Sequence, residues 1–543
     1  MLQPINSYIN YNQLINDIEK GSIKIPQFQR DFVWKKKESA KLLDSIIKGY
    51  PIGTFIIWKT KERLRSIKNV GEINFPETPS GDLVNYVLDG QQRMTSLYCA
   101  IKGIKIKNKI NEIIDYSEIY VDLEALEDEE IVVIDVELEK KSQYIKLVEL
   151  LEGGLSLAKK YDEKYHKKLE DYANRFKTYS FSLITNNEIP IEVATEIFTR
   201  INIGGKSLSV FEIMVAKTFN SEKNFDLSEK YKKFMEKMSS INYDTIPDST
   251  ILQSVAICMV KECSKNQILK LNKDKFIEIW DEVVEAIENT IEHFRHFYRI
   301  PVSQLLPYDG LIIPFTYFFF KHKALPSLEQ QKYLQDYFWR TVLNSRFSSS
   351  LESKVAQDIK KIDAILKNEL PKYQEGVDIS IEELSRNGYF NAGKSYIKGL
   401  LCILAYQIPK SFNNNSLINI NNDWLKQANS KNYHHFFPKS YLKKIGEEDF
   451  YINHIANITI VDDFLNKRII KDQAPNKYMT LFLDNIDLKS TMNSHLITDL
   501  DEYGIWNNDY EKFYIKRLEQ FSFELEKRLI IIKGLDRVKN DII

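Results

Sequence analysis

The feature that most constrains the fold is the stretch 431–477, KNYHHFFPKSYLKKIGEEDFYINHIANITIVDDFLNKRIIKDQAPNK. It holds two adjacent histidines, His434 and His435, followed by Asn457 and Asn466. The run YHHFFP predicts a strand that closes at a turn, and NITIV predicts a second strand. The acidic pair that follows is a good helix N-cap, so Asn466 is expected in the first turns of a helix. Two strands and a helix would bring these four side chains around one point.

Adjacent residues on a strand point to opposite faces, so His434 and His435 are expected to have different roles. A neutral imidazole can accept a proton from water, and a bound divalent ion can neutralise a phosphate. The order of a paired His, a middle Asn and a last Asn resembles that of an HNH nuclease, which implies phosphodiester hydrolysis with His435 as the general base and Asn457 orienting it. His434 and Asn466 are the expected ligands of a divalent metal, Mg or Mn.

Other histidines offer alternatives to this assignment. Asn453 and His454 are rival ligands, placed in a segment that reads as a loop. His293 and His296 have the i, i+3 spacing of a metal site on a helix, but their aromatic neighbours and the lack of a third ligand favour packing.

A second signal lies near the N-terminus, in NYVLDGQQRMTSLYCAI. There Asp89, Gly90, Gln91, Gln92 and Arg93 form a polar turn between a predicted strand and a predicted helix. A helix N-terminus favours anions, and an arginine adds a fork of donors. The turn therefore predicts a phosphate site, on a nucleotide or on DNA. A helix capped by Asp89 with a surface arginine is the alternative.

Three segments in this half of the chain carry a resemblance to a known family: IPQFQRDFVW at 25–34, VLDGQQR at 87–93 and IFTRINIGGKSLSVFEI at 197–213. They resemble the DGQQR domain related to ParB. The C-terminal YHHFFPKS and NITIVDDFLNK resemble the HNH domain often fused to it. Together they are similar to GmrSD-type modification-dependent (type IV) restriction enzymes of bacterial anti-phage defence.

The resemblance implies that the N-terminal domain binds and hydrolyses a nucleoside triphosphate, which gates an HNH nuclease that cuts foreign, modified DNA. Gln29 and Arg30 would line the nucleotide pocket with the DGQQR turn. The residues of the turn that would also take part in hydrolysis are Asp89, Gln91, Gln92 and Arg93. The glycine turn at 202–205 would close over a phosphate, or would only form a tight corner between helices. Many relatives have an acidic residue where this chain has His434, and a nitrogen ligand shifts metal preference towards Mn, Ni or Zn.

The expected fold class is α+β and predominantly helical. It has a ParB-like nucleotide-binding domain at 1–215, a helical connecting domain at 216–408 and a ββα-metal (HNH) nuclease domain with C-terminal helices at 409–543. At 543 residues the chain is long enough for about three domains. The Asn-rich tract at 409–423 is the expected linker before the nuclease segment.

Composition and targeting signals indicate a cytoplasmic protein with no membrane partner. The N-terminus is too polar for a signal peptide, and the apolar run LIIPFTYFFF at 311–320 is too short to cross a bilayer. The four cysteines are too few for a disulfide framework. DNA and a nucleoside triphosphate are the expected partners, and a second copy of the chain is a further candidate.

Two other functions remain open at this point. The chain could be a nucleotide-dependent DNA-binding sensor whose HNH domain is catalytically weak or only nicks DNA. The residues 388–395, GYFNAGKS, also satisfy the P-loop pattern of an ATPase. No buried strand is expected before them, so we interpret them as the start of a helix.

Overall fold

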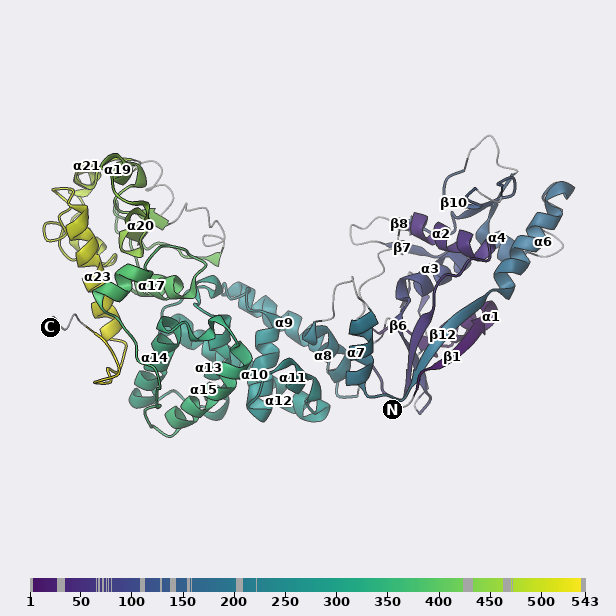
Figure 1. Cartoon of the computed structure of the whole chain (residues 1–543), viewed down its shortest axis with the longest axis horizontal. Helices are drawn as coiled ribbons and strands as arrows, with labels where there is room; N and C mark the ends of the chain where they lie inside the picture. The colour runs from purple at the N-terminus through teal and green to yellow at the C-terminus, as the bar shows by residue number, and fades with distance from the viewer. Residues whose placement is uncertain are drawn as a thin grey trace. The chain divides into compact units, whose positions relative to one another are not determined.

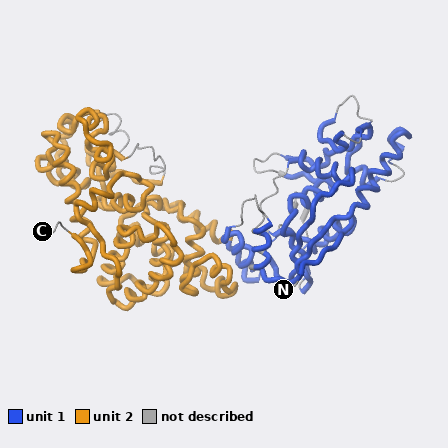
Figure 2. The backbone as a smooth tube through the Cα atoms, in the orientation of Figure 1, with its two compact units in different colours: residues 1–227 blue, residues 228–543 orange. Residues whose placement is uncertain are grey.

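The computed structural model describes residues 3–26, 35–64, 66, 69–70, 73–74, 76, 78–79, 81–107, 113–126, 129–136, 143–153, 157, 159–201, 209–220, 222–422, 433–461, 470 and 472–538. The chain divides into two compact units, 1–227 and 228–543, which are coloured separately in Figure 2. The second unit holds both the helical middle and the C-terminal segment, which the sequence predicted as separate domains. The three domain boundaries stay a prediction.

A five-stranded mixed sheet forms the centre of the first unit, in the order β1–β12–β3–β6–β2 (Figure 1). The strands are β1 (Ile5–Asn10), β2 (Ile23–Lys24), β3 (Phe55–Thr60), β6 (Val84–Asp89) and β12 (Ser180–Asn187). β12 runs parallel to β3 and antiparallel to β1, whereas β6 runs antiparallel to β3 and parallel to β2. The last residue of β6 is Asp89, so the DGQQR turn begins at the C-terminal end of this strand.

Helices pack against this sheet and one another. They are α1 (Tyr11–Glu19), α2 (Lys36–Ile47), α3 (Gln91–Lys102), α4 (Leu147–Glu152), α6 (Glu163–Thr178), α7 (Ile191–Ile201) and α8 (Val210–Thr218). The apolar stripe of α2 is buried, and Gly49 beyond its end has a φ of 75°. The apolar run TFIIW contributes most of the buried strand β3.

Short strands extend the first unit beyond the main sheet. β9 (Tyr120–Asp122) lies between β10 (Val132–Val133) and β11 (Tyr144–Lys146). Two further pairs are β4 (Asn69–Val70) with β5 (Ile73–Asn74), and β7 (Lys105–Lys107) with β8 (Ile113–Asp115).

The second unit begins with a helical array. It consists of α9 (Leu227–Ser240), α10 (Asp248–Val260), α11 (Lys265–Lys270), α12 (Lys273–His296), α13 (Ile312–Lys321), α14 (Leu328–Leu343), α15 (Leu351–Leu366), α16 (Ile381–Asn387) and α17 (Ser395–Tyr406). The apolar run LIIPFTYFFF becomes α13, which packs against α10, α12 and α15 and is buried along most of its length. No helix among the described residues has the length and apolar character needed to cross a membrane. The mixture of sheet and predominant helix agrees with the expected α+β class.

The C-terminal segment adds a two-stranded antiparallel sheet of β13 (Tyr433–His435) and β14 (Ile458–Ile460). The short helices α19 (Lys439–Lys444) and α20 (Asp449–Ile452) and the 3-10 turn η5 (Ile455–Asn457) lie between the two strands in sequence. After β14 come α21 (Pro475–Met479), α22 (Leu488–Asn493) and the long α23 (Tyr510–Glu526), which contacts α16, α17 and η5.

The Asn-rich tract is more ordered than the predicted linker. Asn422 is buried, and its amide donates to the carbonyl of Asn242 and to the carboxylate of Asp244. Lys410 pairs with Leu417 in a β-bridge. Asparagine side chains here satisfy backbone groups, so a composition typical of linkers forms a packed loop.

A buried ion cluster ties the C-terminal end to the helical array. Arg340 on α14 donates to both carboxylate oxygens of Asp336 and makes a bidentate pair with Asp536 at 2.8 and 2.6 Å. Its side chain is 2% exposed and both carboxylates are fully buried. The backbone amides of Val377 and Ile532 also donate to Asp536. The cluster therefore joins three segments that are distant in sequence.

Arg340→Ala is predicted to destabilise the chain by about 3–5 kcal/mol, because it leaves two carboxylates buried without their cation. The matched control is Arg537→Ala, which removes a half-exposed arginine from a surface pair with Asp378 and should cost no more than about 1 kcal/mol. Urea unfolding followed by circular dichroism measures both. Equal losses in the two variants would contradict the role given to the cluster.

The buried imidazole of His495 is expected to make the stability of the second unit depend on pH. It is 1% exposed, its Nε2 donates to the carbonyl of Lys410, and burial lowers its pKa from 6.5 to about 4. The unfolded chain therefore takes up a proton below about pH 6.5 that the folded chain refuses, so stability falls from there towards pH 4. His495→Gln, which keeps a donor for Lys410, should show a shallower fall in melting temperature across this range. The exposed His296→Gln is the control, and identical slopes in all three proteins would refute the prediction.

Candidate functional site

The β13–β14 hairpin positions the two adjacent histidines. His434 pairs with Thr459 and His435 pairs with Ile458 in the antiparallel register. Both histidines are nearly buried, and the aromatic residues around them are part of the core. The two strands predicted from the sequence are therefore present. Asn466 and the helix expected to carry it lie outside the described residues.

His435 has the features of a neutral imidazole without a fixed partner. Its side chain is 9% exposed, and Nε2 is buried with no hydrogen-bond partner among the described residues. Burial and then the nearby charge of Lys439 lower its pKa to about 3, whereas an interaction with the side chain of Asn453 raises it. At neutral pH the ring is uncharged, so it can accept a proton or bind a cation.

His434 occupies a different environment, as expected for its neighbour on a strand. Its Nδ1 lies 3.3 Å from the hydroxyl of Thr459, and its ring meets Tyr478 edge to face. Burial, followed by the charges of His435 and His495, lowers its pKa to about 3. Both imidazoles are thus held neutral, which is the form that a metal ligand must have.

Asn457 makes different hydrogen bonds from the predicted ones. Its amide nitrogen donates to the carbonyls of Phe437 and Ile452, and its oxygen accepts from the amide of Phe437 at 2.8 Å. These contacts fix the backbone just after His435 and do not reach the imidazole. Asn453 interacts with that ring instead. No sequence pattern indicates that Asn453, at the C-terminal end of α20, interacts with His435.

His454, the alternative ligand, is a structural residue. Its Nδ1 accepts from the amide of Ala456 at 3.1 Å, so Nε2 carries the proton and donates to the carbonyl of Ser385 at 3.1 Å. Both ring nitrogens are occupied and the side chain is fully buried. His454 therefore caps η5 and holds it against α16.

Lys439 is a candidate that the sequence analysis did not select. It opens α19, and its charge acts on His435 strongly enough to lower the pKa of the imidazole. Burial also lowers the pKa of Lys439 itself, with Asp449 opposing this shift. The motif YHHFFPKS contained the signal, since a lysine four residues after a candidate base can supply positive charge to a phosphate.

The DGQQR turn forms as the sequence predicted. Asp89 ends β6, Gly90 has a left-handed φ of 90°, and α3 starts at Gln91. A side chain at Gly90 would collide with the ring of Phe55, so space and conformation both require glycine. Gln91 and Gln92 are nearly buried. The N-terminus of α3 is compatible with an anion.

Arg93 contacts its own fold. Its guanidinium donates to the carbonyl of Ile52 at 2.7 Å, to that of Thr54 at 3.1 Å and to Asp89 at 3.1 Å. A Cβ at Gly53 would lie 2.4 Å from its Nη1. The arginine therefore ties the start of α3 to the segment before β3, and 18% of its side chain is exposed. Gln29, Arg30 and the glycine turn at 202–205 lie outside the described residues.

The P-loop pattern at 388–395 is a helix start, as interpreted from the sequence. The helix α16 precedes it, and α17 begins at Ser395. Gly388 packs against the imidazole of His454, where an added Cβ would lie 2.0 Å from Nε2. Tyr389 forms a β-bridge with His454. This glycine makes room for a side chain and does not wrap a phosphate.

The helical histidine pair is also structural. The ring of His293 stacks on Phe297 and meets Phe319 edge to face, whereas His296 is exposed and lies 2.7 Å from Glu292. Within the described part of the chain, no three His, Cys, Asp or Glu side chains are grouped closely enough to hold a metal ion. Asn466, the amide predicted to complete the hairpin site, is outside that part.

Comparisons with known proteins bear on the first unit and on the chain as a whole. The chain is 26% identical over 524 residues to the uncharacterized protein MJ0686 of Methanocaldococcus jannaschii, an alignment that covers 87% of this chain and 86% of the relative. One family model matches, from α1 to α8, and it covers β2, β3, β6 and β12 of the main sheet and the DGQQR turn. Residues 11–219 are thus similar to the N-terminal domain of the GmrSD restriction endonucleases.

Proposed function

We propose that the chain is a metal-dependent DNA endonuclease gated by a nucleoside triphosphate, acting in the cytoplasm on foreign, modified DNA. The observation that carries the proposal is the hairpin, where the buried Nε2 of His435 has no hydrogen-bond partner among the described residues and the charge of Lys439 acts on the ring. The similarity of residues 11–219 to a restriction endonuclease domain supports DNA as the substrate. A nucleotide-dependent DNA sensor with a weak nuclease is the alternative that the experiments below separate from it.

His435 is the proposed general base. Its neutral ring is available at pH 7, but a pKa of about 3 makes it a weak proton acceptor in the free protein. A phosphodiester bound beside Lys439 would bring negative charge to the ring and raise the pKa of His435. The substrate itself would thus activate the base, and Asn453 would keep the ring oriented.

His434 and Asn466 are the proposed ligands of Mg or Mn. The neutral state of His434 fits metal binding, and its neighbour Thr459 fixes the ring. A divalent ion held there would neutralise the scissile phosphate and stabilise the leaving oxygen. Asn457 would keep the strand ends in place by holding Phe437 and Ile452.

The DGQQR turn is the proposed nucleotide site, formed by Asp89, Gly90, Gln91, Gln92 and Arg93, with Gln29 and Arg30 beside it. The helix N-terminus of α3 would receive a phosphate. Because Arg93 holds Ile52 and Thr54, a phosphate that draws its guanidinium away would release this segment. Nucleotide binding would then change the loop before β3, which offers a route for gating.

His435→Ala is predicted to abolish plasmid cleavage in the presence of Mg or Mn, because it removes the proposed general base. Cleavage is measured on agarose gels, with EDTA as the metal-free arm, which should also stop cutting. His296→Ala, an exposed histidine of the same unit, should cut normally. Cleavage that survives His435→Ala would refute the assigned base, and a folded chain that never cuts any DNA would favour the sensor.

Arg93→Ala is predicted to lose nucleotide hydrolysis and to lose or deregulate cleavage, while His435→Ala keeps hydrolysis. Loss of a charge-assisted contact weakens nucleotide binding by about ten- to a hundredfold. Phosphate release and plasmid cutting are measured on the same preparations. Lys102→Ala, at the other end of α3, is the matched control.

Because Arg93 also has structural contacts, its thermal melting is compared with that of Asp89→Asn, which keeps a hydrogen-bond acceptor for the guanidinium. The proposal of two separate sites would be contradicted if a folded Arg93→Ala protein hydrolysed nucleotide normally, or if His435→Ala lost nucleotide hydrolysis.

A further inference from the structure

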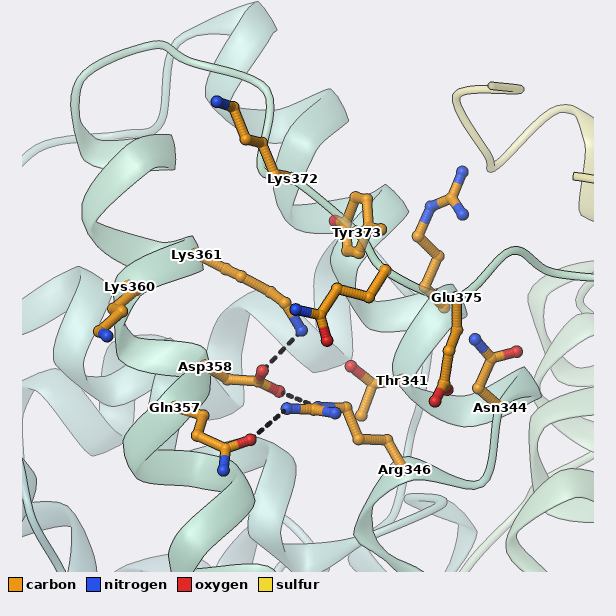
Figure 3. A pocket seen from close by; sticks show the side chains of 12 residues that line it. Thr341, Asn344, Arg346, Gln357, Asp358, Lys360, Lys361, Lys372, Tyr373 and Glu375 are labelled. Atoms are coloured by element: carbon orange, nitrogen blue, oxygen red, sulfur yellow. Dashed lines mark hydrogen bonds and ion pairs between the residues drawn. The ribbon is translucent and has the colours of Figure 1, made fainter. Parts of the chain in front are cut away.

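A pocket of about 460 Å³ opens in the second unit, between the end of α14, the middle of α15 and the segment at 372–375 (Figure 3). All of its lining residues belong to this unit, and none is part of the hairpin or of the DGQQR turn. Its volume is within the range of sites that hold small ligands. The lining is polar and rich in cations.

Two cations share one carboxylate at the floor of the pocket. Nζ of Lys361 lies 2.6 Å from Asp358, and Nε of Arg346 lies 2.7 Å from the same side chain. Figure 3 shows both side chains converging on Asp358, which is fully buried and also accepts from the hydroxyl of Tyr337. One carboxylate cannot neutralise two cations, so the floor keeps an excess positive charge.

The rim increases this excess. Lys360 and Lys372 extend from the edge of the pocket, and neither has an ion-pair partner among the described residues. Glu375 is the one acidic side chain on the rim, and it offsets one of these charges. A fifth cation, Arg340, belongs to the buried cluster with Asp336 and Asp536, whose two carboxylates exceed its charge by one. The pocket and the cluster beside it are therefore positive by about one charge.

Burial makes this charge costly when the pocket is empty. Desolvation lowers the pKa of Lys361 despite its pairing with Asp358, whereas pairing with Asp358 raises the pKa of Arg346 against the effect of burial. A partly desolvated ammonium with a shared counter-ion gains stability from a second anion. Arg346 also has an Nη1 that donates to no described residue, and its planar fork suits a tetrahedral oxyanion.

We propose that this pocket binds a phosphate group. Its excess positive charge favours an anion, and Arg346 and Lys361 supply donors from adjacent positions. The phosphate could belong to a small phosphorylated molecule, which the volume accommodates, or to the backbone of a nucleic acid whose phosphate enters from the rim. The site is built from residues other than those of the proposed nuclease and nucleotide sites, so its occupation does not depend on cleavage.

Residue-resolved lysine acetylation of the full-length protein tests the proposal without a variant. The protein is labelled alone, with inorganic phosphate, with ATP and with a short DNA duplex, and the peptides are read by mass spectrometry. Lys361 and Lys372 should be protected by at least one of these probes. Lys367, at the exposed C-terminal end of α15, is the internal control and should react equally throughout.

Protection by phosphate or ATP identifies a small ligand, and protection by the duplex alone identifies the nucleic-acid backbone. Lys361→Gln should then weaken binding of the protecting probe by about ten- to a hundredfold in calorimetry or fluorescence anisotropy, whereas Lys367→Gln should not. The proposal is overturned if no probe protects Lys361, or if the two variants bind alike. If a probe protects Lys361 but the protein cuts no DNA, the result contradicts the nuclease proposal and leaves the phosphate site supported.

Discussion

The guanidinium of Arg517 is a buried charge on which the C-terminal half of the second unit depends. Arg517 lies on α23, its side chain is fully buried, and it has no carboxylate partner among the described residues. Its donors go to three backbone carbonyls, those of Ala456, Ile458 and His495. Burial lowers its pKa to about 10, so it stays charged at neutral pH. An isolated ion in the core is costly unless several strong acceptors surround it, and these acceptors belong to η5, β14 and the segment after α22. The charge can therefore be buried only when these three segments are in place together.

This arrangement explains how a hairpin with such short strands can hold a chemical site. Arg517 fixes β14 from one side, and Tyr478 donates to the carbonyl of Phe436, next to β13, at 2.6 Å. Asn457 closes the remaining gap by holding Phe437. Two strands alone are marginally stable in water, and here side chains from later helices supply the missing support. The positions of His434 and His435 thus come from the whole C-terminal segment.

The sequence was informative wherever the determinants are local. The strand containing His435, the turn at Gly90 and the helix start within 388–395 follow from periodicity and turn chemistry, and the structure has all three. It was not informative about which side chains meet across long distances. Nothing near Arg93 in sequence indicates the carbonyls of Ile52 and Thr54, and nothing near Asn457 distinguishes a backbone contact from a contact to an imidazole. Composition failed at Asn422, because asparagines serve linkers and packed loops equally well.

The contact between Gly388 and His454 couples two positions that lie far apart in the chain. The imidazole of His454 occupies the space that a side chain at position 388 would need. The ring in turn carries two backbone hydrogen bonds that a smaller residue would leave unmade. Any larger residue at 388 must expel the imidazole, and a chain that has lost the imidazole no longer needs glycine there. Natural variants of this protein should therefore exchange the two residues as a pair, and the resemblance of GYFNAGKS to a nucleotide-binding motif should vanish in chains that have made the exchange.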